Sequence, residues 1–422
     1  MEYAEALAWV HSRPRLPKKA GLDRMKQLMD ALGNPQRMLR FIHVAGTNGK
    51  GSTVAMLSSV LTQAGYCVGS NYSPFVLDFR ERFQVNGNWV DEAVLAKAFT
   101  QIHLASQTLA EPVVEFEVVT AAAFLCFYWA DCDIVCLETG LGGRWDSTNI
   151  IENTLVACIT RIGYDHMDLL GNTIGEIAMT KCGIIKQGCA VVSYPTQPKE
   201  AEEVILWECT KLQTPLVIPN IQDVQQTQPK AFLNTFRYKG EEFALSLLGS
   251  HQQQNATVAI EALFLLRQKG FCISMQDIKA GLKETHFPAR FEVLRHSPPV
   301  ILDGAHNQDS AEALAQTLEE QGVKGIAAIA GVLGDKQAAE VIRLVSPYIH
   351  ILYTVQPDSP RALTAEALKE TAAPFVKSIV SCSDVRQALH QAEEEGKGIL
   401  IFGSLYLASE VRPLLLEKYK PE

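Results

Sequence analysis

The sequence predicts an α/β protein in which a doubly wound parallel-sheet domain with a phosphate-binding loop (P-loop) precedes a smaller Rossmann-like α/β domain. Apolar strand patterns alternate with helical patterns along the chain, which is typical of a parallel sheet covered by helices. Polar clusters directly follow several of these strands, where such sheets bind ligands. The chain has 422 residues, too many for one core. A fresh alternation near residue 300 predicts domains at 1–295 and 296–422, linked at 295–299.

The expected elements follow from the period of their apolar residues. In the first domain, strands are expected at 41–44, 66–70, 133–137, 154–160, 190–193 and 216–218. Helices are expected at 3–10, 22–32, 54–61, 91–109, 115–129, 174–183, 200–211, 251–268 and 275–283. Asn86-Gly87 between apolar residues predicts a hairpin at 82–90, and 232–247 resembles a β-ribbon. In the second domain, strands are expected at 300–302, 325–332, 350–355 and 398–402.

The stretch 41–52, FIHVAGTNGKGS, reads as strand, glycine-rich turn and helix start. In this arrangement backbone amides and a helix N-terminus face an anion, and Lys50 adds a point charge. The usual pattern has a glycine where Val44 stands and a hydroxyl where Gly51 stands, so Ser52 would supply the hydroxyl one place late. A glycine-rich turn in an ordinary βα unit is the other interpretation.

Net charge, apolar stretches and cysteine spacing argue against several classes of function. A net charge of −9 without a basic run argues against nucleic-acid binding. The N-terminus carries Glu2 and Glu5, unlike a secretory signal, and the longest apolar stretch, 118–130, is shorter than the about twenty residues that cross a bilayer. The ten cysteines are scattered without a CxxC pair, as in reduced cytosolic proteins. We therefore expect a cytoplasmic protein, by default a monomer, that binds neither nucleic acid nor a membrane.

A triphosphate on this loop requires Mg²⁺, which takes oxygen ligands. Ser73 and Glu138 are candidate ligands because both follow predicted strands. The alternative for Glu138 is a salt bridge to Arg144 or a cap on the glycine loop. His166 also falls after a strand, and it is either a hydrogen-bonded core residue or a metal ligand or general base. Lys181 lies on a predicted helix, and its spacing alone does not select it.

The second domain opens with Asp303-Gly-Ala-His306-Asn307 directly after a strand. An aspartate and a histidine there suit recognition of a ribose, phosphate or amino-acid group, although Asp303 could instead cap the next helix. Arg290 precedes the expected linker and could reach into a cleft. Asp335-Lys336 form a further, weaker pair at a strand end.

Taken together, these motifs resemble the folylpolyglutamate synthase/dihydrofolate synthase family, relatives of the Mur peptide ligases. The resemblance covers nearly the whole chain and rests on motifs that occur in order: GLDRM (21–25), LGNP (32–35), HVAGTNGKGS (43–52), SPF (73–75), ERF (81–83), FEVVTAAAF (116–124), ETGLGGRWDSTN (138–149), DHMDLLG (165–171), KCGIIK (181–186), FPARFE (287–292), DGAHN (303–307) and GSLYLASEVR (403–412). Each motif alone is modest evidence, whereas the ordered set is specific.

The resemblance implies roles for individual positions. ATP would be bound by Thr47, Asn48, Gly49, Lys50, Gly51, Ser52, Asn255, Arg290 and Asp303. Mg²⁺ would be ligated by Ser73, Glu138 and His166. The folate pocket would be lined by Arg82, Phe116, Thr120, Asp146, Ser147 and Thr148. Catalytic roles would fall to Lys50, His166, Lys181 and His306, with Lys181 carbamylated to N6-carboxylysine.

The sequence departs from the family pattern at a few positions: Tyr72, Thr139, Trp145, Ser147 and Gln308. None removes an expected ligand, but Trp145 and Ser147 flank the pocket loop and bear on substrate preference. The resemblance implies an ATP-dependent ligase that adds L-glutamate to the γ-carboxylate of folate through an acyl phosphate. The alternative is a bifunctional enzyme that also makes dihydrofolate from dihydropteroate.

Other classes fit the sequence less well. A GTPase would carry an NKxD motif, which is absent, and a simple kinase would not need the second domain with DGAHN. A Mur ligase would be expected to have a nucleotide-sugar-binding domain ahead of the loop. A non-catalytic nucleotide-binding module would not need so many polar residues at strand ends.

Overall fold

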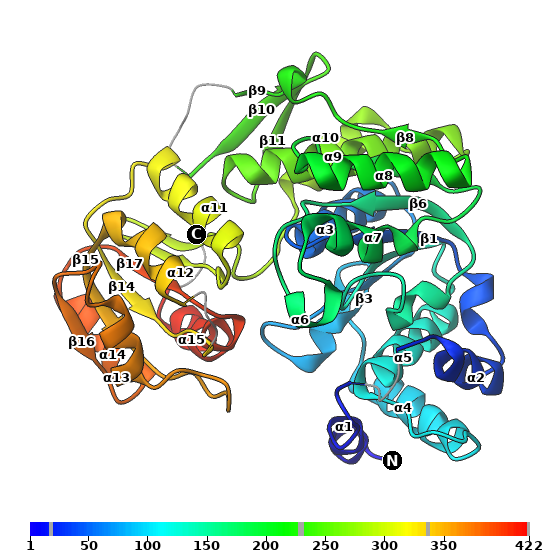
Figure 1. Ribbon diagram of the computed structural model, residues 1–422, viewed down its shortest axis with the longest axis horizontal. Helices are drawn as coiled ribbons and strands as arrows, with labels where there is room; N and C mark the ends of the chain where they lie inside the picture. The colour runs from blue at the N-terminus through cyan, green and yellow to red at the C-terminus, as the bar shows by residue number, and fades with distance from the viewer. Residues whose placement is uncertain (17–19, 227–231, 335–337, 420–422) are drawn as a thin grey trace. The chain divides into compact units, whose positions relative to one another are not determined.

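The protein is described by a computed structural model that covers residues 1–16, 20–226, 232–334 and 338–419 (Figure 1). Asp335 and Lys336 lie outside the described residues. Contacts between residues divide the chain into two compact units. The first unit comprises Met1–Asp223 and Gln254–Thr285, and the second comprises Val224–Gln253 and His286–Glu422. No helix in the described ranges has the length and hydropathy that crossing a membrane requires.

The described part of the first unit is built on an eight-stranded sheet in the order β4-β3-β2-β5-β1-β6-β7-β8. Its strands are β1 (Phe41–Ala45), β2 (Val68–Asn71), β3 (Phe83–Val85), β4 (Asn88–Trp89), β5 (Ile134–Glu138), β6 (Thr154–Ile159), β7 (Ala190–Ser193) and β8 (Leu216–Val217). The pairings are parallel except for the predicted hairpin, where β3 runs antiparallel to β2 and to β4. The expected doubly wound parallel sheet is therefore confirmed.

Helices cover this sheet. They are α1 (Tyr3–His11), α2 (Asp23–Ala31), α3 (Lys50–Gln63), α4 (Glu92–Ser106), α5 (Glu115–Trp129), α6 (Met167–Leu170), α7 (Ile174–Lys181), α8 (Lys199–Leu212), α9 (Ser250–Gln268), which enters this unit at Gln254, and α10 (Met275–Lys283). Helix α3 packs on β1, β2 and β5 and runs beside α10 (Figure 1). Helix α5 is apolar nearly all round, so it is buried, and its Phe124 meets Phe41 of β1 edge to face.

The second unit contains two sheets in the residues described. The strands β9 (Gln225–Gln226), β10 (Asn234–Tyr238) and β11 (Glu241–Leu245) form the predicted antiparallel ribbon. A second sheet has the order β12-β13-β17-β14-β15-β16, with β12 (Glu292–His296), β13 (Pro299–Leu302), β14 (Ile326–Ala330), β15 (Ile349–Thr354), β16 (Ile379–Ser381) and β17 (Ile399–Phe402). Its helices are α11 (Gln308–Glu320), α12 (Ala338–Val345), α13 (Ala365–Ala372), α14 (Val385–Glu394) and α15 (Leu405–Lys418).

The linker expected at 295–299 is wrong. β12 pairs antiparallel with β13, so these residues form the turn of a hairpin at the edge of the second sheet. Prolines and polar residues mark tight turns as well as linkers, which explains the error. The compact units accordingly do not divide at residue 295, because β12 and the β9–β11 ribbon both belong to the second unit.

Candidate active site

The residues predicted to hold phosphates and metal follow neighbouring strands of the first unit. In the order β2-β5-β1-β6, the phosphate loop follows β1, Ser73 follows β2, and Glu138 ends β5. Val44 of β1 is in register with Glu138, and the N–H of Thr139 donates to the Val44 carbonyl at 3.0 Å. Parallel pairing thus brings residues far apart in the sequence to one edge of the sheet, where ligands of such folds bind.

The phosphate loop is held by the segment that follows β6. The backbone N–H groups of Thr47 and Asn48 donate to the carbonyl of Arg161 at 2.8 and 3.2 Å. The Thr47 hydroxyl donates to the Gly163 carbonyl and accepts from its N–H, both at 3.0 Å. Gly49 has a φ of 86° and precedes the first turn of α3. The loop therefore enters the helix N-terminus in a fixed conformation, as anion binding requires.

We expect Gly49→Ala to weaken ADP binding about tenfold and to lower the free energy of unfolding by about 1–2 kcal/mol. A Cβ at Gly49 would lie 2.4 Å from Oδ1 of the buried Asn255, and the positive φ strains any L side chain. Calorimetric titration and urea unfolding measure the two effects. Gly65→Ala is the matched control, since Gly65 has a φ of +87° but open space around its Cβ position. It should lose similar stability and keep ADP binding; equal loss of binding in both variants would contradict the prediction.

Two lysines converge on the loop. Lys50 Nζ donates to the carbonyls of Gly46 and Thr47 at 3.1 Å each, and Lys181 Nζ donates to the Gly46 carbonyl at 2.7 Å. Lys181 is only 4% exposed. Burial and the neighbouring Lys50 charge lower the pKa of Lys181 to about 7. A lysine that spacing alone did not select thus lies against the phosphate loop, with a large neutral fraction at physiological pH.

Of the three predicted metal ligands, Ser73 and Glu138 are in direct contact. The N–H of Ser73 donates to Glu138 Oε2 at 3.1 Å, and Glu138 is buried. His166 has its Nε2 3.7 Å from Asp165 Oδ1 and a side chain that is 55% exposed. The alternative of His166 as a core residue is therefore wrong.

Ser73 and Glu138 offer the kind of donor atoms that Mg²⁺ binds. A hydroxyl and a carboxylate are hard oxygen ligands, and Mg²⁺ commonly uses one or two protein ligands while it keeps several waters. Across the described ranges, no group of three His, Cys, Asp or Glu side chains is placed to hold a metal. The Ser73 hydroxyl and the Glu138 carboxylate are donors of the kind that Mg²⁺ accepts.

The loop 140–149 carries half of the predicted folate-binding residues, Asp146, Ser147 and Thr148, and all three are buried. Asp146 accepts the N–H of Leu141 at 2.8 Å and both the N–H and hydroxyl of Thr148, at 3.0 and 2.5 Å. Burial raises the pKa of Asp146, and these hydrogen bonds oppose that shift. Ser147 is buried too, whereas Trp145 is 58% exposed. The buried polar side chains hold the conformation of this loop, and the Trp145 side chain extends from it into solvent.

The other predicted folate-binding residues are Phe116 and Thr120, which lie in α5, and Arg82, which directly precedes β3. The Phe116 ring lies against Gly140, where a Cβ would be 2.5 Å from its Cζ, and Thr120 donates to the Phe116 carbonyl at 2.7 Å. The Arg82 guanidinium lies over the rings of Phe75 and Phe79, at 5.2 and 5.6 Å from their centroids. Its Nη1 lies 3.4 Å from the Ser73 hydroxyl, which places Arg82 next to the candidate metal ligand.

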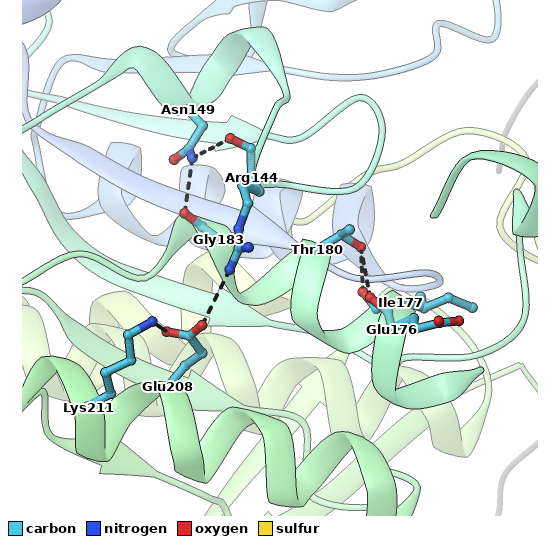
Figure 2. A network of polar contacts seen from close by, with 8 residues as sticks. All are labelled: Arg144, Asn149, Glu176, Ile177, Thr180, Gly183, Glu208 and Lys211. Atoms are coloured by element: carbon cyan, nitrogen blue, oxygen red, sulfur yellow. Dashed lines mark hydrogen bonds and ion pairs between the residues drawn. The ribbon is translucent and has the colours of Figure 1, made fainter. Parts of the chain in front are cut away.

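The loop 140–149 is also hydrogen-bonded to the last turn of α7 and to the residues that follow it (Figure 2). The Arg144 N–H donates to the Thr180 carbonyl at 2.8 Å. The Asn149 amide donates to the carbonyls of Arg144 and Gly183, at 3.2 and 3.0 Å. A Cβ at Gly183 would lie 2.4 Å from Arg144 Cα, so only glycine permits this approach. The loop therefore sits directly on the segment that contains Lys181.

The Arg144 side chain extends to α8, where its Nη2 lies 3.4 Å from Glu208 Oε1 (Figure 2). The alternative in which Glu138 forms a salt bridge to Arg144 is therefore wrong. Glu208 is buried and also contacts Lys211 at 3.4 Å. The sequence did not lead us to select Glu208, which lies outside the family motifs. Its ion pair with Arg144 connects the loop 140–149 to α8.

We expect a double-mutant cycle on Arg144→Ala and Glu208→Ala to give a coupling free energy of unfolding of about 1 kcal/mol. The pair is 40% and 5% exposed, so solvent screens it only in part. Urea unfolding of the four proteins measures the coupling. The Arg37–Glu152 pair, at 3.8 Å with both side chains more than half exposed, is the control and should give a value near zero. Equal coupling in the two cycles would show that Glu208 does not brace the loop.

In the second unit, Asp303 organises the DGAHN turn. Its two carboxylate oxygens accept the N–H groups of Ala305 and Phe291, each at 2.7 Å. Burial raises the pKa of Asp303, and the nearby Arg290 charge opposes this. Asn307, not Asp303, caps α11 with its side chain. The alternative of Asp303 as a helix cap is therefore wrong.

Arg290 and His306 flank the same turn. Arg290 stacks over the Phe287 ring at 5.3 Å, and a Cβ at Gly304 would be 2.8 Å from Arg290 Nη1. His306 Nδ1 lies 2.8 Å from the Gly304 carbonyl. The second unit thus assembles Arg290, Asp303 and His306 around one turn, while the other predicted nucleotide-binding residues, including Asn255, belong to the first unit.

Comparison with known proteins assigns the class. Residues 44–263 match the Mur ligase middle domain, and residues 289–405 match the Mur ligase glutamate ligase domain. The chain is 39% identical to "Dihydrofolate synthase/folylpolyglutamate synthase" of Bacillus subtilis, over 98% of this chain and 99% of the relative. It is 35% identical to "Folylpolyglutamate synthase" of Lacticaseibacillus casei, over 99% of each.

Solved structures agree. A Mycobacterium tuberculosis folylpolyglutamate synthase complexed with ADP and AMPPCP superposes with a TM-score of 0.89 at 30% identity, covering 100% of this chain and 99% of that one. E. coli FolC in complex with DHPP and ADP superposes with a TM-score of 0.87 at 28% identity, covering 99% and 98%. The fold and the matched domains define a Mur-type ligase, a class that forms amide bonds. Within that class, the chain belongs to the folylpolyglutamate synthase/dihydrofolate synthase family, as its motifs predicted.

Proposed function

We propose that this chain is an ATP-dependent ligase that adds L-glutamate to the γ-carboxylate of folate. The observation that carries this proposal is a match over nearly the whole chain to relatives with that name. The folate carboxylate attacks the γ-phosphorus of ATP, and ADP leaves. The glutamate nitrogen then attacks the acyl phosphate, phosphate leaves, and the nitrogen loses a proton to give the amide. ATP is needed because amide formation in water is uphill.

The first unit supplies the charge stabilisation. Thr47, Asn48, Gly49, Lys50, Gly51 and Ser52 bind the phosphates through loop amides, the helix N-terminus and the Lys50 ammonium. Ser73 and Glu138 would hold Mg²⁺, with His166 as a further ligand. When bound, the ion neutralises negative charge on the phosphate oxygens. The support for this arrangement is the shared edge of the sheet at which the loop, Ser73 and Glu138 lie.

Lys181 is proposed to react with carbon dioxide. Its neutral nitrogen would add to the carbon of CO₂ and release a proton, which gives an N6-carboxylysine that resembles a carboxylate. This chemistry needs an unprotonated amine, and the pKa of Lys181 of about 7 provides one. The modification would place a negative charge near the loop and so offer an additional oxygen ligand.

The remaining predicted residues complete the proposal. Asn255, Arg290 and Asp303 contact the nucleotide, and His306 acts near the reacting groups. The pterin is bound by the pocket residues Arg82, Phe116, Thr120, Asp146, Ser147 and Thr148. Closure around the acyl phosphate would keep water from hydrolysing it. We further propose a monomeric enzyme of the cytoplasm.

Dihydrofolate synthesis is a second candidate activity, favoured by the bifunctional names of the B. subtilis and M. tuberculosis relatives. One assay tests both activities: ATP-dependent incorporation of labelled glutamate, run in parallel with tetrahydrofolate and with dihydropteroate. Incorporation with tetrahydrofolate supports the first function, and incorporation with dihydropteroate supports the second. ATP consumption without incorporation into either acceptor would overturn both.

A further inference from the structure

A buried hydrogen-bond chain connects the strand before the phosphate loop to the loop 140–149. His43 lies in β1 and is fully buried. Its Nε2 is 2.9 Å from the Thr148 hydroxyl oxygen, which in turn is 2.5 Å from Asp146 Oδ1. The proposed ligase mechanism assigns no role to this buried histidine. The chain joins a residue of the phosphate-loop strand to two residues of the proposed pterin pocket.

The protons of this chain can be assigned from its geometry. A threonine hydroxyl has one proton and can also accept. Asp146 receives the N–H groups of Leu141 and Thr148 besides the hydroxyl, and three donors favour a carboxylate. The Thr148 proton therefore points at Asp146, and the Thr148 oxygen must accept from His43 Nε2–H.

The other ring nitrogen of His43 agrees with this assignment. Nδ1 is buried and has no hydrogen-bond partner among the described residues. The opposite tautomer would place an N–H donor there without an acceptor, and orphaned buried N–H groups are rarer than under-satisfied acceptors. Burial also lowers the pKa of His43 to about 3, so the ring stays neutral.

We propose that His43 is a positioning residue, in its neutral Nε2–H tautomer, that holds Asp146 through Thr148 and so fixes the pterin-pocket loop relative to the phosphate-loop strand. The assignment of the pocket rests on the proposed function, whereas the tautomer does not. Because β1 leads directly into the phosphate loop, the same strand sets the position of both substrate-binding loops.

Nuclear magnetic resonance of the wild-type protein with ¹⁵N-labelled histidine tests the tautomer. His43 should show a protonated Nε2 and an unprotonated Nδ1, unchanged between about pH 5 and 8, where free histidine titrates. His43→Gln identifies the signal by its loss. A protonated Nδ1, or a His43 that titrates in this range, would overturn the proposal even if ligation were never observed.

Kinetics test the positioning role. His43→Leu and Thr148→Val break the chain and should each raise KM for the folate roughly tenfold, with KM for ATP changed less than about twofold. The double variant should be no worse than either single one. Unchanged folate KM in His43→Leu, or additive losses in the double variant, would overturn the proposal.

Discussion

Replacing Lys50 with alanine is expected to reduce ligation at least about a thousandfold, which corresponds to about 4 kcal/mol of transition-state stabilisation. Lys50 begins α3, and its Nζ is held by the carbonyls of Gly46 and Thr47. The ammonium is therefore fixed within the loop before the nucleotide arrives, and little reorganisation is needed when charge develops on the transferring phosphoryl group. Alanine at position 50 removes this positive charge from the phosphate loop.

Single-turnover formation of ADP with folate and glutamate measures the effect on chemistry. ADP titration measures binding separately and should change less than the rate. Lys26→Ala, at a side chain that is 60% exposed in α2, is the control and should behave like wild type. Turnover of Lys50→Ala within about tenfold of wild type would contradict the assignment of Lys50 to phosphoryl transfer.

The sequence predicted the first unit well because its central elements carry strong signals. The run DIVCL became β5 and the apolar stretch 115–129 became α5, since continuous burial leaves few alternatives. Asn86-Gly87 likewise identified the β3–β4 hairpin. In the second unit, β12 and β16 were missed. Both are edge strands with partly exposed side chains, so neither shows the apolar pattern on which the prediction depended.

The site was predicted in part, and the misses have a common cause. Ser73 and Glu138 were selected as residues that follow strands, and the structure brings them into contact. Lys181 and Glu208 were not selected by their spacing, because charged residues on helices were assumed to face solvent. In α7 the buried positions are Ile174, Ile177, Ala178 and Lys181, and in α8 they are Ala201, Ile205, Glu208 and Cys209. Each charge lies on the apolar stripe of its helix, a signal readable from the sequence.

Replacing Lys181 with methionine is expected to abolish ligation and yet stabilise the protein. Burial lowers the pKa of Lys181 from 10.5 to about 7, so the folded state disfavours the charged form that the unfolded chain adopts. The resulting cost is complete below about pH 7, decreases by about 1.4 kcal/mol per pH unit above it, and vanishes above about pH 10.5. Methionine has a similar length and no charge, so the variant escapes this cost and loses one hydrogen bond to Gly46.

Urea unfolding near pH 7.5 and pH 9.5, in buffer depleted of carbon dioxide, measures this effect. The stability of wild type should gain about 2 to 3 kcal/mol relative to Lys181→Met between the two pH values, because folding releases the Lys181 proton and a higher pH favours that release. Lys26→Met should follow wild type, since Lys26 is exposed. A constant difference between wild type and Lys181→Met would show that Lys181 is charged when folded.

Bicarbonate separates the buried amine from its proposed modification. A carbamate that forms only on folded Lys181 stabilises the native state by mass action, so added bicarbonate should raise the Tm of wild type and leave Lys181→Met unchanged. The same treatment should increase ligation by the wild-type enzyme after dialysis against carbon-dioxide-free buffer. If bicarbonate shifts neither Tm nor activity while the pH dependence persists, Lys181 acts as a neutral amine against the Gly46 carbonyl, and the additional metal ligand is lost from the proposal.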